Sequence, residues 1–300
     1  MSLVFDQFTG EYIEHGYVKY NNVTLHYVTA GKKDAPLCIL LHGFPQTWLT
    51  WRYVIPKLTD HFRVAALDLR GYGKSDKPEG MENYDKKAMA GDIKVLLQHL
   101  NVPKALIAGH DRGGRVARRL ALDYPEFVTG LVLIDILPME YVYNSITAAD
   151  AATKYWHWVF QVVEELPEEM LKGKEEVYLK FLLSRGDGLF EKFSSDGSWN
   201  EYLAAWKQPG AVLAALNDYR AAYNIDLPRY RTEKQPTIDM PALLLWGEKG
   251  NLTGLPVTEI WNRIIPGVTG KEIKNCGHYV PEEKPEETAE NIIEFFKRIE

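Results

Sequence analysis

The sequence has few cysteines and no long uncharged apolar run. Cys38 and Cys276 are its only cysteines, too few for a disulfide framework, which favours reduced thiols in a cytosolic protein. No apolar segment approaches the roughly 18–20 residues that a membrane-spanning helix needs. The first residues include early acidic side chains and lack the basic-then-apolar pattern of a signal peptide. We therefore expect a cytoplasmic protein with no membrane partner.

Positively charged residues are outnumbered by negatively charged ones. The chain has 35 Lys and Arg against 41 Asp and Glu, a net charge of −6. A general nucleic-acid binder needs a basic face, so no nucleic-acid partner is predicted. The 46% hydrophobic and 25% charged residues are ordinary for a folded globular chain. The acidic stretches 164–176 and 282–300 are predicted to be solvated helix faces.

Strand-like and helix-like segments alternate along much of the chain. Residues 17–20 and 23–28, separated by Asn21 and Asn22, predict a β-hairpin. Short apolar runs typical of strands covered on both faces follow at Leu37–Leu41, Val64–Leu69, Ala105–Ala108, Leu131–Ile134 and Ala242–Trp246. Helical patterns lie between them at 85–100, 113–123, 257–264 and 285–299. The alternation predicts an α/β fold with a mostly parallel twisted sheet flanked by helices.

This alternation stops near residue 138. From there to about residue 230 the chain is rich in Trp, Tyr, Leu and Glu and has a helical pattern. Because so many aromatic residues would not remain solvated, an inserted cap explains the segment better than a linker does. The sequence therefore predicts a core of residues 1–138 and 231–300, with a helical cap at 139–230 over the active site.

A nucleophile is predicted at Asp111. The strand at 105–108 runs into Gly109-His110-Asp111-Arg112-Gly113, and a helix follows. This strand–turn–helix context is that of a nucleophile elbow, with Asp where Ser is usual. The short Gly-x-Asp-x-Gly string alone would also fit a structural turn. Two further pieces support catalysis: His278 ends the last strand-like segment, and the 42–45 segment, His-Gly-Phe-Pro, follows an early strand. Backbone N–H groups of Phe44 and Arg112 are the expected oxyanion donors.

A carboxylate nucleophile restricts the chemistry. Asp is already ionised near neutral pH, but its attack on an acyl carbon would give a high-energy anhydride. A saturated carbon with a leaving group would instead give an ester, which water activated by His278 can hydrolyse. The nucleophile therefore favours dehalogenation or epoxide opening over ordinary ester hydrolysis.

Arg112 and Arg115 favour an anionic substrate. They lie three residues apart at a helix start, beside Asp111, so they are expected to share a face. Guanidinium groups bind carboxylates through paired hydrogen bonds, and they would offset the repulsion of about 4 kcal/mol between two carboxylates ~4 Å apart at an effective dielectric constant of about 20. Pairing with acidic neighbours at the surface is the alternative for both, and is expected for Arg118 and Arg119.

Longer motifs resemble a known family. They are HGFPQTW (42–48), DLRGYGKSDKP (68–78), GHDRGGRVARRLALDYP (109–125), IDILPMEY (134–141), YWHW (155–158), DYRAAY (218–223) and CGHYVPEE (276–283). Together they resemble the haloacetate dehalogenases, the fluoroacetate dehalogenase group of the α/β-hydrolase superfamily. The resemblance implies an α/β-hydrolase fold, a small anionic haloacid substrate, no metal or other cofactor, and a homodimer.

The resemblance also implies roles for individual residues. It makes Asp135 the acid that orients His278, where many relatives carry the acid after a later strand. Here that later stretch reads Trp-Gly-Glu-Lys-Gly (246–250), which leaves Glu248 as an alternative. His157, Trp158 and Tyr219 would bind the departing halide, since each can donate a hydrogen bond. From the residues alone, the favoured interpretations are cap packing for Trp156 and Trp158 and a satisfied core histidine for His157.

One departure from the family lies in the cap, where this chain reads Leu-Leu-Ser-Arg-Gly (182–186) and relatives often carry Trp. A wider pocket at Arg185 would put the preference for fluoroacetate in doubt. The alternative reaction is epoxide hydrolysis with the same Asp-His-Asp set, for which Tyr219 and Tyr155 could serve as acids. A non-catalytic ligand-binding member of the fold is a third reading, although such a protein would not need the complete set.

Overall fold

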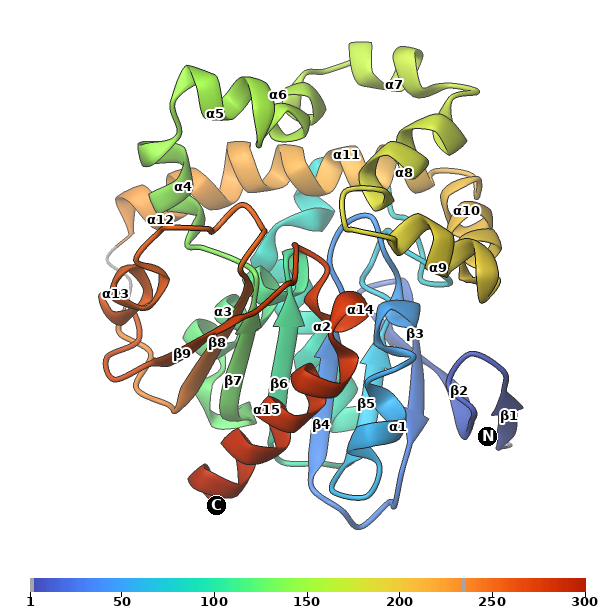
Figure 1. The fold of residues 1–300 in the computed structure, drawn as a ribbon, viewed down its shortest axis with the longest axis vertical. Helices are drawn as coiled ribbons and strands as arrows, with labels where there is room; N and C mark the ends of the chain where they lie inside the picture. The colour runs from blue at the N-terminus through green and yellow to red at the C-terminus, as the bar shows by residue number, and fades with distance from the viewer. Residues whose placement is uncertain (1–2, 234–235) are drawn as a thin grey trace.

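The computed structural model describes residues 3–233 and 236–300. Its strands form one sheet in the order β1-β2-β3-β5-β4-β6-β7-β8-β9 (Figure 1). The strands are β1 (Val4–Asp6), β2 (Glu11–Tyr20), β3 (Val23–Ala30), β4 (Leu37–Leu41), β5 (Arg63–Leu67), β6 (Ala105–His110), β7 (Val128–Ile134), β8 (Ala242–Gly247) and β9 (Thr269–Ile273). From β5 to β9 every neighbouring pair is parallel, which confirms the predicted mostly parallel sheet.

The antiparallel edge begins with the predicted hairpin. Tyr20 pairs with Val23, and Asn21 and Asn22 both have positive φ, 46° and 63°. Two successive residues of positive φ are the geometry of a type I′ turn, whose twist matches that of the flanking strands. The structure extends the hairpin strands beyond the predicted ranges, to Glu11 and Ala30.

Helices cover both faces of the sheet, as the buried strands require. In Figure 1, α1 and α15 lie in front of the sheet, and α2 and α3 lie behind it. The helical segments of the core, outside the cap described below, are η1 (Trp48–Trp51), α1 (Ile55–Leu58), η2 (Met81–Tyr84), α2 (Lys86–His99), α3 (Arg112–Asp123), η3 (Pro125–Phe127), α13 (Val257–Asn262), α14 (Val280–Glu283) and α15 (Pro285–Ile299). All five side chains of β4 are buried between the two layers.

A second set of helices follows β7 and lies across the carboxyl ends of the parallel strands (Figure 1). We call this set the cap. Its segments are α4 (Met139–Ser145), α5 (Ala148–Thr153), α6 (Trp156–Val162), α7 (Leu166–Leu171), α8 (Glu175–Leu183), α9 (Leu189–Ser195), α10 (Ser198–Trp206), α11 (Ala211–Ala221), the π-helix η4 (Ala222–Asp226) and α12 (Leu227–Thr232). Ligands bind outside the carboxyl ends of the strands in open α/β sheets, so the site is expected between sheet and cap.

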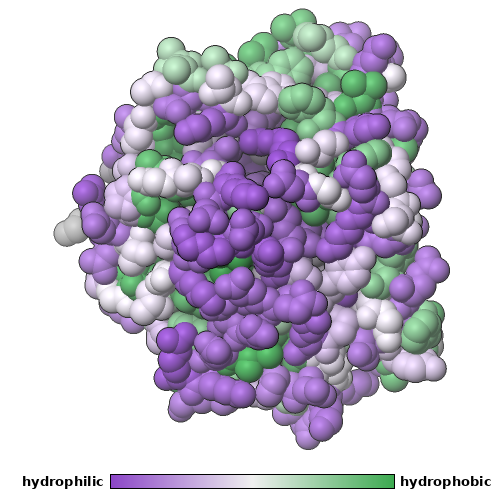
Figure 2. Space-filling model, viewed as in Figure 1, coloured by the Kyte–Doolittle hydropathy of each residue, from purple (hydrophilic) through white to green (hydrophobic). Residues whose placement is uncertain are grey.

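The surface in Figure 2 is mostly hydrophilic, with apolar side chains gathered at the top, over α6, α7 and α8. Exposed apolar residues on these helices include Val159, Leu166, Met170, Val177 and Phe181. Within the described ranges no helix has both the length and the apolar character needed to cross a membrane.

Candidate active site

Asp111 occupies a strained turn between β6 and α3. Its backbone has φ 48° and ψ −114°, a conformation that non-glycine residues rarely adopt and that is found mostly at functional sites. The turn depends on its glycines, because a Cβ at Gly113 would lie 2.4 Å from the Leu41 carbonyl oxygen. The turn places the largely buried Asp111 carboxylate at the carboxyl end of the sheet, facing the cap.

The loop after β4 contacts the same carboxylate. The Phe44 N–H donates to Asp111 Oδ1 over 3.1 Å, and a Cβ at Gly43 would lie 2.5 Å from the Asp111 Cβ. Phe44 was one of two predicted oxyanion donors. The other, the Arg112 N–H, makes no hydrogen bond to the Asp111 side chain in the described structure.

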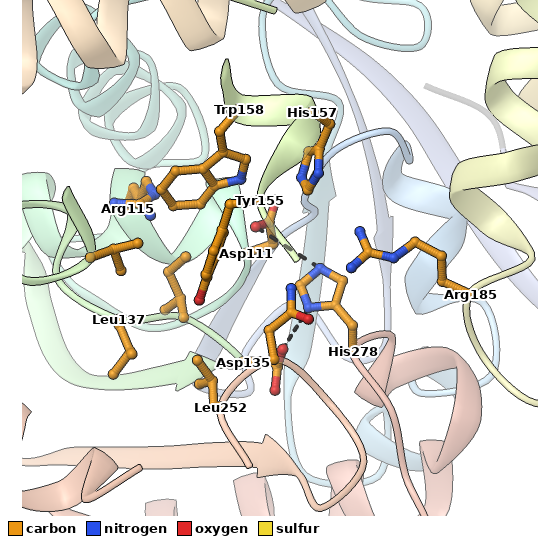
Figure 3. Close-up of a pocket in the computed structure, with 13 residues that line it drawn as sticks. Asp111, Arg115, Asp135, Leu137, Tyr155, His157, Trp158, Arg185, Leu252 and His278 are labelled. Atoms are coloured by element: carbon orange, nitrogen blue, oxygen red, sulfur yellow. Dashed lines mark hydrogen bonds and ion pairs between the residues drawn. The ribbon is translucent and has the colours of Figure 1, made fainter. Parts of the chain in front are cut away.

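His278 lies between two carboxylates (Figure 3). Its Nδ1 is 2.5 Å from Asp135 Oδ2, and its Nε2 is 4.0 Å from Asp111 Oδ2. The first contact fixes the ring and leaves Nε2 facing the nucleophile. A separation of this size suits a bridging water better than a direct hydrogen bond. The geometry can therefore activate a water beside the Asp111 carboxyl group.

The position of the acid has a structural explanation. Asp135 follows β7, and its Oδ1 accepts the Gly247 N–H over 3.1 Å. A Cβ at Gly250 would lie only 3.3 Å from the same oxygen. Residues that follow β7 and β8 can therefore place a side chain at the same position beside His278. Glu248 instead accepts from the Asn275 N–H and from Lys274. The contacts thus place Asp135, and not Glu248, against the histidine.

The charges of this group support one another. Burial alone would raise the pKa of Asp111, but the nearby His278, His110, Arg112 and Arg115 hold it below its ordinary value. Burial alone would lower the pKa of His278, and the hydrogen bond and charge of Asp135 raise it instead. The nucleophile is therefore ionised over a wide pH range.

Glu283 holds the loop that carries His278. Its carboxylate accepts the N–H groups of Gly277 and Tyr279 over 2.6 and 3.0 Å. The neighbouring Glu282 is completely buried and paired with Arg52 at 2.7 Å. The prediction that the acidic stretch 282–300 is a solvated helix face was therefore wrong at its start, because local charge density does not reveal a cation more than two hundred positions away.

Arg112 and Arg115 have different surroundings although they begin the same helix. Arg112 is fixed by Asp218 of the cap, with Nε 3.0 Å from Oδ2 and Nη2 2.5 Å from Oδ1. Arg115 forms no hydrogen bond or ion pair with any described residue, and its Nε and Nη2 are buried. Its guanidinium carbon lies 5.0 Å from the Trp158 ring centroid. The Arg115 guanidinium is thus unpaired at the wall of the site.

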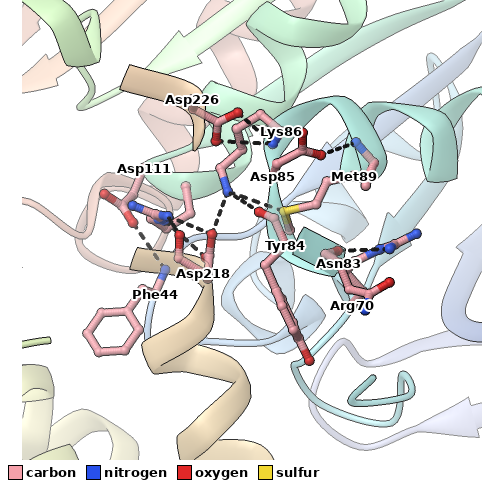
Figure 4. A network of polar contacts seen from close by, with 12 residues as sticks. Phe44, Arg70, Asn83, Tyr84, Asp85, Lys86, Met89, Asp111, Asp218 and Asp226 are labelled. Atoms are coloured by element: carbon pink, nitrogen blue, oxygen red, sulfur yellow. Dashed lines mark hydrogen bonds and ion pairs between the residues drawn. The ribbon is translucent and has the colours of Figure 1, made fainter. Parts of the chain in front are cut away.

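Asp218 was missed by the sequence analysis (Figure 4). It is completely buried and also accepts from the Tyr72 hydroxyl over 2.8 Å and from the Lys86 ammonium. Burial would raise its pKa, but Arg112 and Lys86 lower it. Only its place in the motif at 218–223 could have drawn attention to it. Its effect is to fix one arginine of the pair in place.

Arg118 and Arg119 are a further correction. Both were expected at the surface, yet they are only 3% and 6% exposed. The pairing with acids was right: Arg118 binds Glu140 at 2.7 Å and Arg119 binds Asp123 at 2.5 Å. Helix α3 packs against α2, and Arg118 reaches Glu140 and the Tyr230 ring of the cap, so even charged side chains of this helix are covered.

The three predicted halide ligands lie together but not equivalently. His157 and Trp158 line the cavity, and Figure 3 shows their rings facing the space beside Asp111. Tyr219 is buried behind them, with its ring centroid 6.1 Å from His157 and 6.4 Å from Trp158. Burial, followed by the charge of Arg185, lowers the pKa of His157 to about 3, so this imidazole is neutral.

The cavity above Asp111 has a volume of about 420 Å³, part of it open to solvent. Arg115 and His278 line it, and so do Arg185 and Tyr155, the latter considered from the sequence only as an acid for epoxide hydrolysis. Burial and the nearby Asp135 raise the pKa of Tyr155 to about 12, so its hydroxyl can donate a hydrogen bond. Within the described ranges, no group of His, Cys, Asp and Glu side chains forms a metal site.

Comparison with known proteins identifies the fold family. Residues 36–285 match the α/β-hydrolase fold family. The chain is 31% identical to a fluoroacetate dehalogenase of Burkholderia sp over 95% of this chain and 94% of that one. It is 32% identical to a soluble epoxide hydrolase of Corynebacterium sp. (strain C12), over 95% and 97%. The crystal structure of ALR0039 from Nostoc sp PCC 7120, assigned to the α/β-hydrolases, has a TM-score of 0.87 and 37% identity, covering 96% of this chain and 99% of that one.

Proposed function

Because the chain belongs to the α/β-hydrolase fold family, we propose that this hydrolase acts on carbon–halogen bonds and converts fluoroacetate and chloroacetate to glycolate and halide. Relatives of similar identity are a dehalogenase and an epoxide hydrolase. The choice between the two reactions therefore depends on the residues of this chain.

The observation that carries the proposal is the unpaired guanidinium of Arg115. A buried cation without a partner is costly, and this one lines the cavity next to the nucleophile. A substrate carboxylate would satisfy its free Nε and Nη2 with paired hydrogen bonds. An epoxide carries no charge and would leave the guanidinium unpaired. The site thus suits an anionic substrate.

Displacement would begin with the substrate carboxylate on Arg115, and with Arg112 contributing positive charge beside it. Asp111 attacks the α-carbon, the carbon–halogen bond breaks, and the halide leaves with the bonding electrons. His157 and Trp158 face the space beside Asp111 and can donate hydrogen bonds to the departing ion. Tyr219, which lies behind these two rings, is the third predicted donor.

The resulting aspartyl ester needs water. His278, held by Asp135, takes a proton from water, and the hydroxide attacks the ester carbonyl carbon. The Phe44 N–H already contacts Asp111 Oδ1 and would stabilise the developing oxyanion, together with the predicted Arg112 N–H. Collapse releases glycolate and restores Asp111. The balance is one haloacetate and one water giving glycolate, halide and a proton.

Halide release tests the proposal. Purified protein with fluoroacetate or chloroacetate should release halide and glycolate in equal amounts, measured with an ion-selective electrode and a glycolate assay. Arg115→Gln should lower kcat/KM for chloroacetate by about tenfold to a hundredfold, the value of a charge-assisted hydrogen-bonded contact. Arg119→Gln, on the same helix but paired with Asp123, is the control and should stay near wild type. Turnover of a simple epoxide without halide release from either acid would refute the proposal.

Epoxide hydrolysis is the second candidate, and Tyr155 favours it. Its protonated hydroxyl belongs to a cavity-lining side chain and makes no hydrogen bond in the described structure, as a proton donor to an opening epoxide would require. Tyr219, the other proposed acid, is also protonated because burial raises its pKa well above the ordinary value. Under this reading, Tyr155→Phe lowers styrene oxide hydrolysis and leaves any chloroacetate turnover unchanged.

A further inference from the structure

A second cation lines the cavity wall away from Arg115. Arg185 lies between α8 and α9 of the cap and lines the same cavity as Asp111 and His278. In Figure 3 its guanidinium extends from the right toward His157 and His278, and Arg115 lies on the left, beyond Trp158. The reacting carboxylate thus lies between two arginines that enter from different elements.

No acid of the protein neutralises Arg185. It forms no hydrogen bond or ion pair in the part of the chain that the structure describes. Asp187, two residues on, pairs instead with Lys249 at 3.2 Å. Arg185 faces His157 and His278, whose protonation its charge disfavours, and its charge also acts on the hydroxyl groups of Tyr155 and Tyr279.

The two acids at the cavity are engaged elsewhere. Asp135 holds His278 at 2.5 Å, and Asp111 must stay free to attack carbon. A haloacetate has one carboxylate, which the Arg115 wall can bind. The positive charge at Arg185 would have no counterpart in such a substrate.

We propose that Arg185 binds a second anionic group of the substrate. The preferred substrates are then 2-halo dicarboxylates, in which the reacting α-carbon carries a short side arm that ends in the second carboxylate. This inference rests on the proposed dehalogenation. The first carboxylate lies on Arg115, the halogen points toward His157 and Trp158, and the side arm reaches Arg185. Attack by Asp111 and hydrolysis of the ester convert the substrate and one water to a 2-hydroxy dicarboxylate, halide and a proton.

The placement of Arg185 supports a specificity role over a structural one. Arg185 is an exposed residue that also lines the cavity, so solvent reaches its side chain and an incoming ligand can do so too. A planar guanidinium at such a position binds a carboxylate through two parallel hydrogen bonds.

Turnover of two haloacids tests the inference. Wild-type protein should have a kcat/KM for 2-chlorosuccinate at least as high as for chloroacetate. Arg185→Gln should lower kcat/KM for 2-chlorosuccinate by about tenfold to a hundredfold, and that for chloroacetate by less than about threefold. Lys249→Gln is the matched control, because it removes a nearby surface cation that does not line the cavity; it should change neither value by more than about twofold.

Binding of unreactive anions separates this inference from the proposed reaction. Calorimetry should show that wild-type protein binds succinate more tightly than acetate, and that Arg185→Gln removes this advantage. If chloroacetate is dehalogenated but the advantage of succinate is absent or survives the substitution, the inference is wrong and the proposed function stands. If the tighter binding of succinate depends on Arg185 but neither haloacid releases halide, the anion site stands and the proposed dehalogenation is wrong. An equal loss for both haloacids in Arg185→Gln would mean general attraction of anions and would also overturn the inference.

Discussion

Replacing Asp218 by Asn should destabilise the fold by about 3–5 kcal/mol, the usual cost of removing one partner from a buried ion pair. Asp218 is completely buried and binds both Arg112 and Lys86. Asn keeps the shape but removes the charge, so two buried cations lose their common partner. Since the folded-state pKa of Asp218 is lowered, its stabilisation is fully present above the unfolded value of about 3.9 and is lost as the pH falls through the folded value.

Urea unfolding at pH 7, followed by circular dichroism, measures this cost. The control is Glu176→Gln, which removes the carboxylate from the exposed ion pair with Lys207 and should cost less than about 1 kcal/mol. A double-variant cycle with Lys86→Met sharpens the test, because the loss of Asp218 should cost less by about 0.5–3 kcal/mol when one of its cations is already gone.

Additive effects of Asp218→Asn and Lys86→Met, or a loss no larger than that of Glu176→Gln, would refute this reasoning. The variant also has a functional readout. If Asp218 fixes Arg112 beside the nucleophile, folded Asp218→Asn protein should show a raised KM for chloroacetate. An unchanged KM would mean that the ion pair is structural only.

Two further predictions concern His278. Ester hydrolysis should slow about tenfold per pH unit below the pKa of His278, which Asp135 holds above 6.5. Halide release in the first turnover should stay constant over the same range, because the pKa of Asp111 is lowered. A rapid-quench measurement in which both steps change together with pH would contradict this. Asp135→Ala should reduce turnover by on the order of a thousandfold, and adding Gly250→Asp should restore at least about tenfold of it, since a Cβ there lies 3.3 Å from Asp135 Oδ1. No recovery in a folded double variant would show that the acid must come from β7.

The arrangement of the core follows from local sequence signals. Strands buried on both faces are continuous apolar runs, and the paired Asn residues at 21 and 22 specify the hairpin turn. The elbow at Asp111 is equally local, because strand, glycines and helix are contiguous in the chain. The position of His278 follows from chain order in the sheet, since the loops after parallel strands meet at one edge.

Pairing between distant segments is what local signals do not reveal. The partner of Arg112 is 106 positions away in the cap, and that of Arg52 is 230 positions away. Each acid involved lies in a stretch that reads as ordinary helix surface. Only the packing of cap on core, and of α14 against the sheet, removes these carboxylates from water and makes a partner necessary.

Arg112 and Arg115 show how this affects a functional conclusion. Their spacing places both on one side of α3 next to the nucleophile, and that much was predictable. The sequence treats them as an equivalent pair, yet the cap supplies an acid to Arg112 and an aromatic ring to Arg115. One guanidinium is therefore fixed by the protein and the other is left for a ligand. The cap also brings Arg185 to the cavity without an acid, and there its exposed guanidinium is available to the second carboxylate of the proposed substrate.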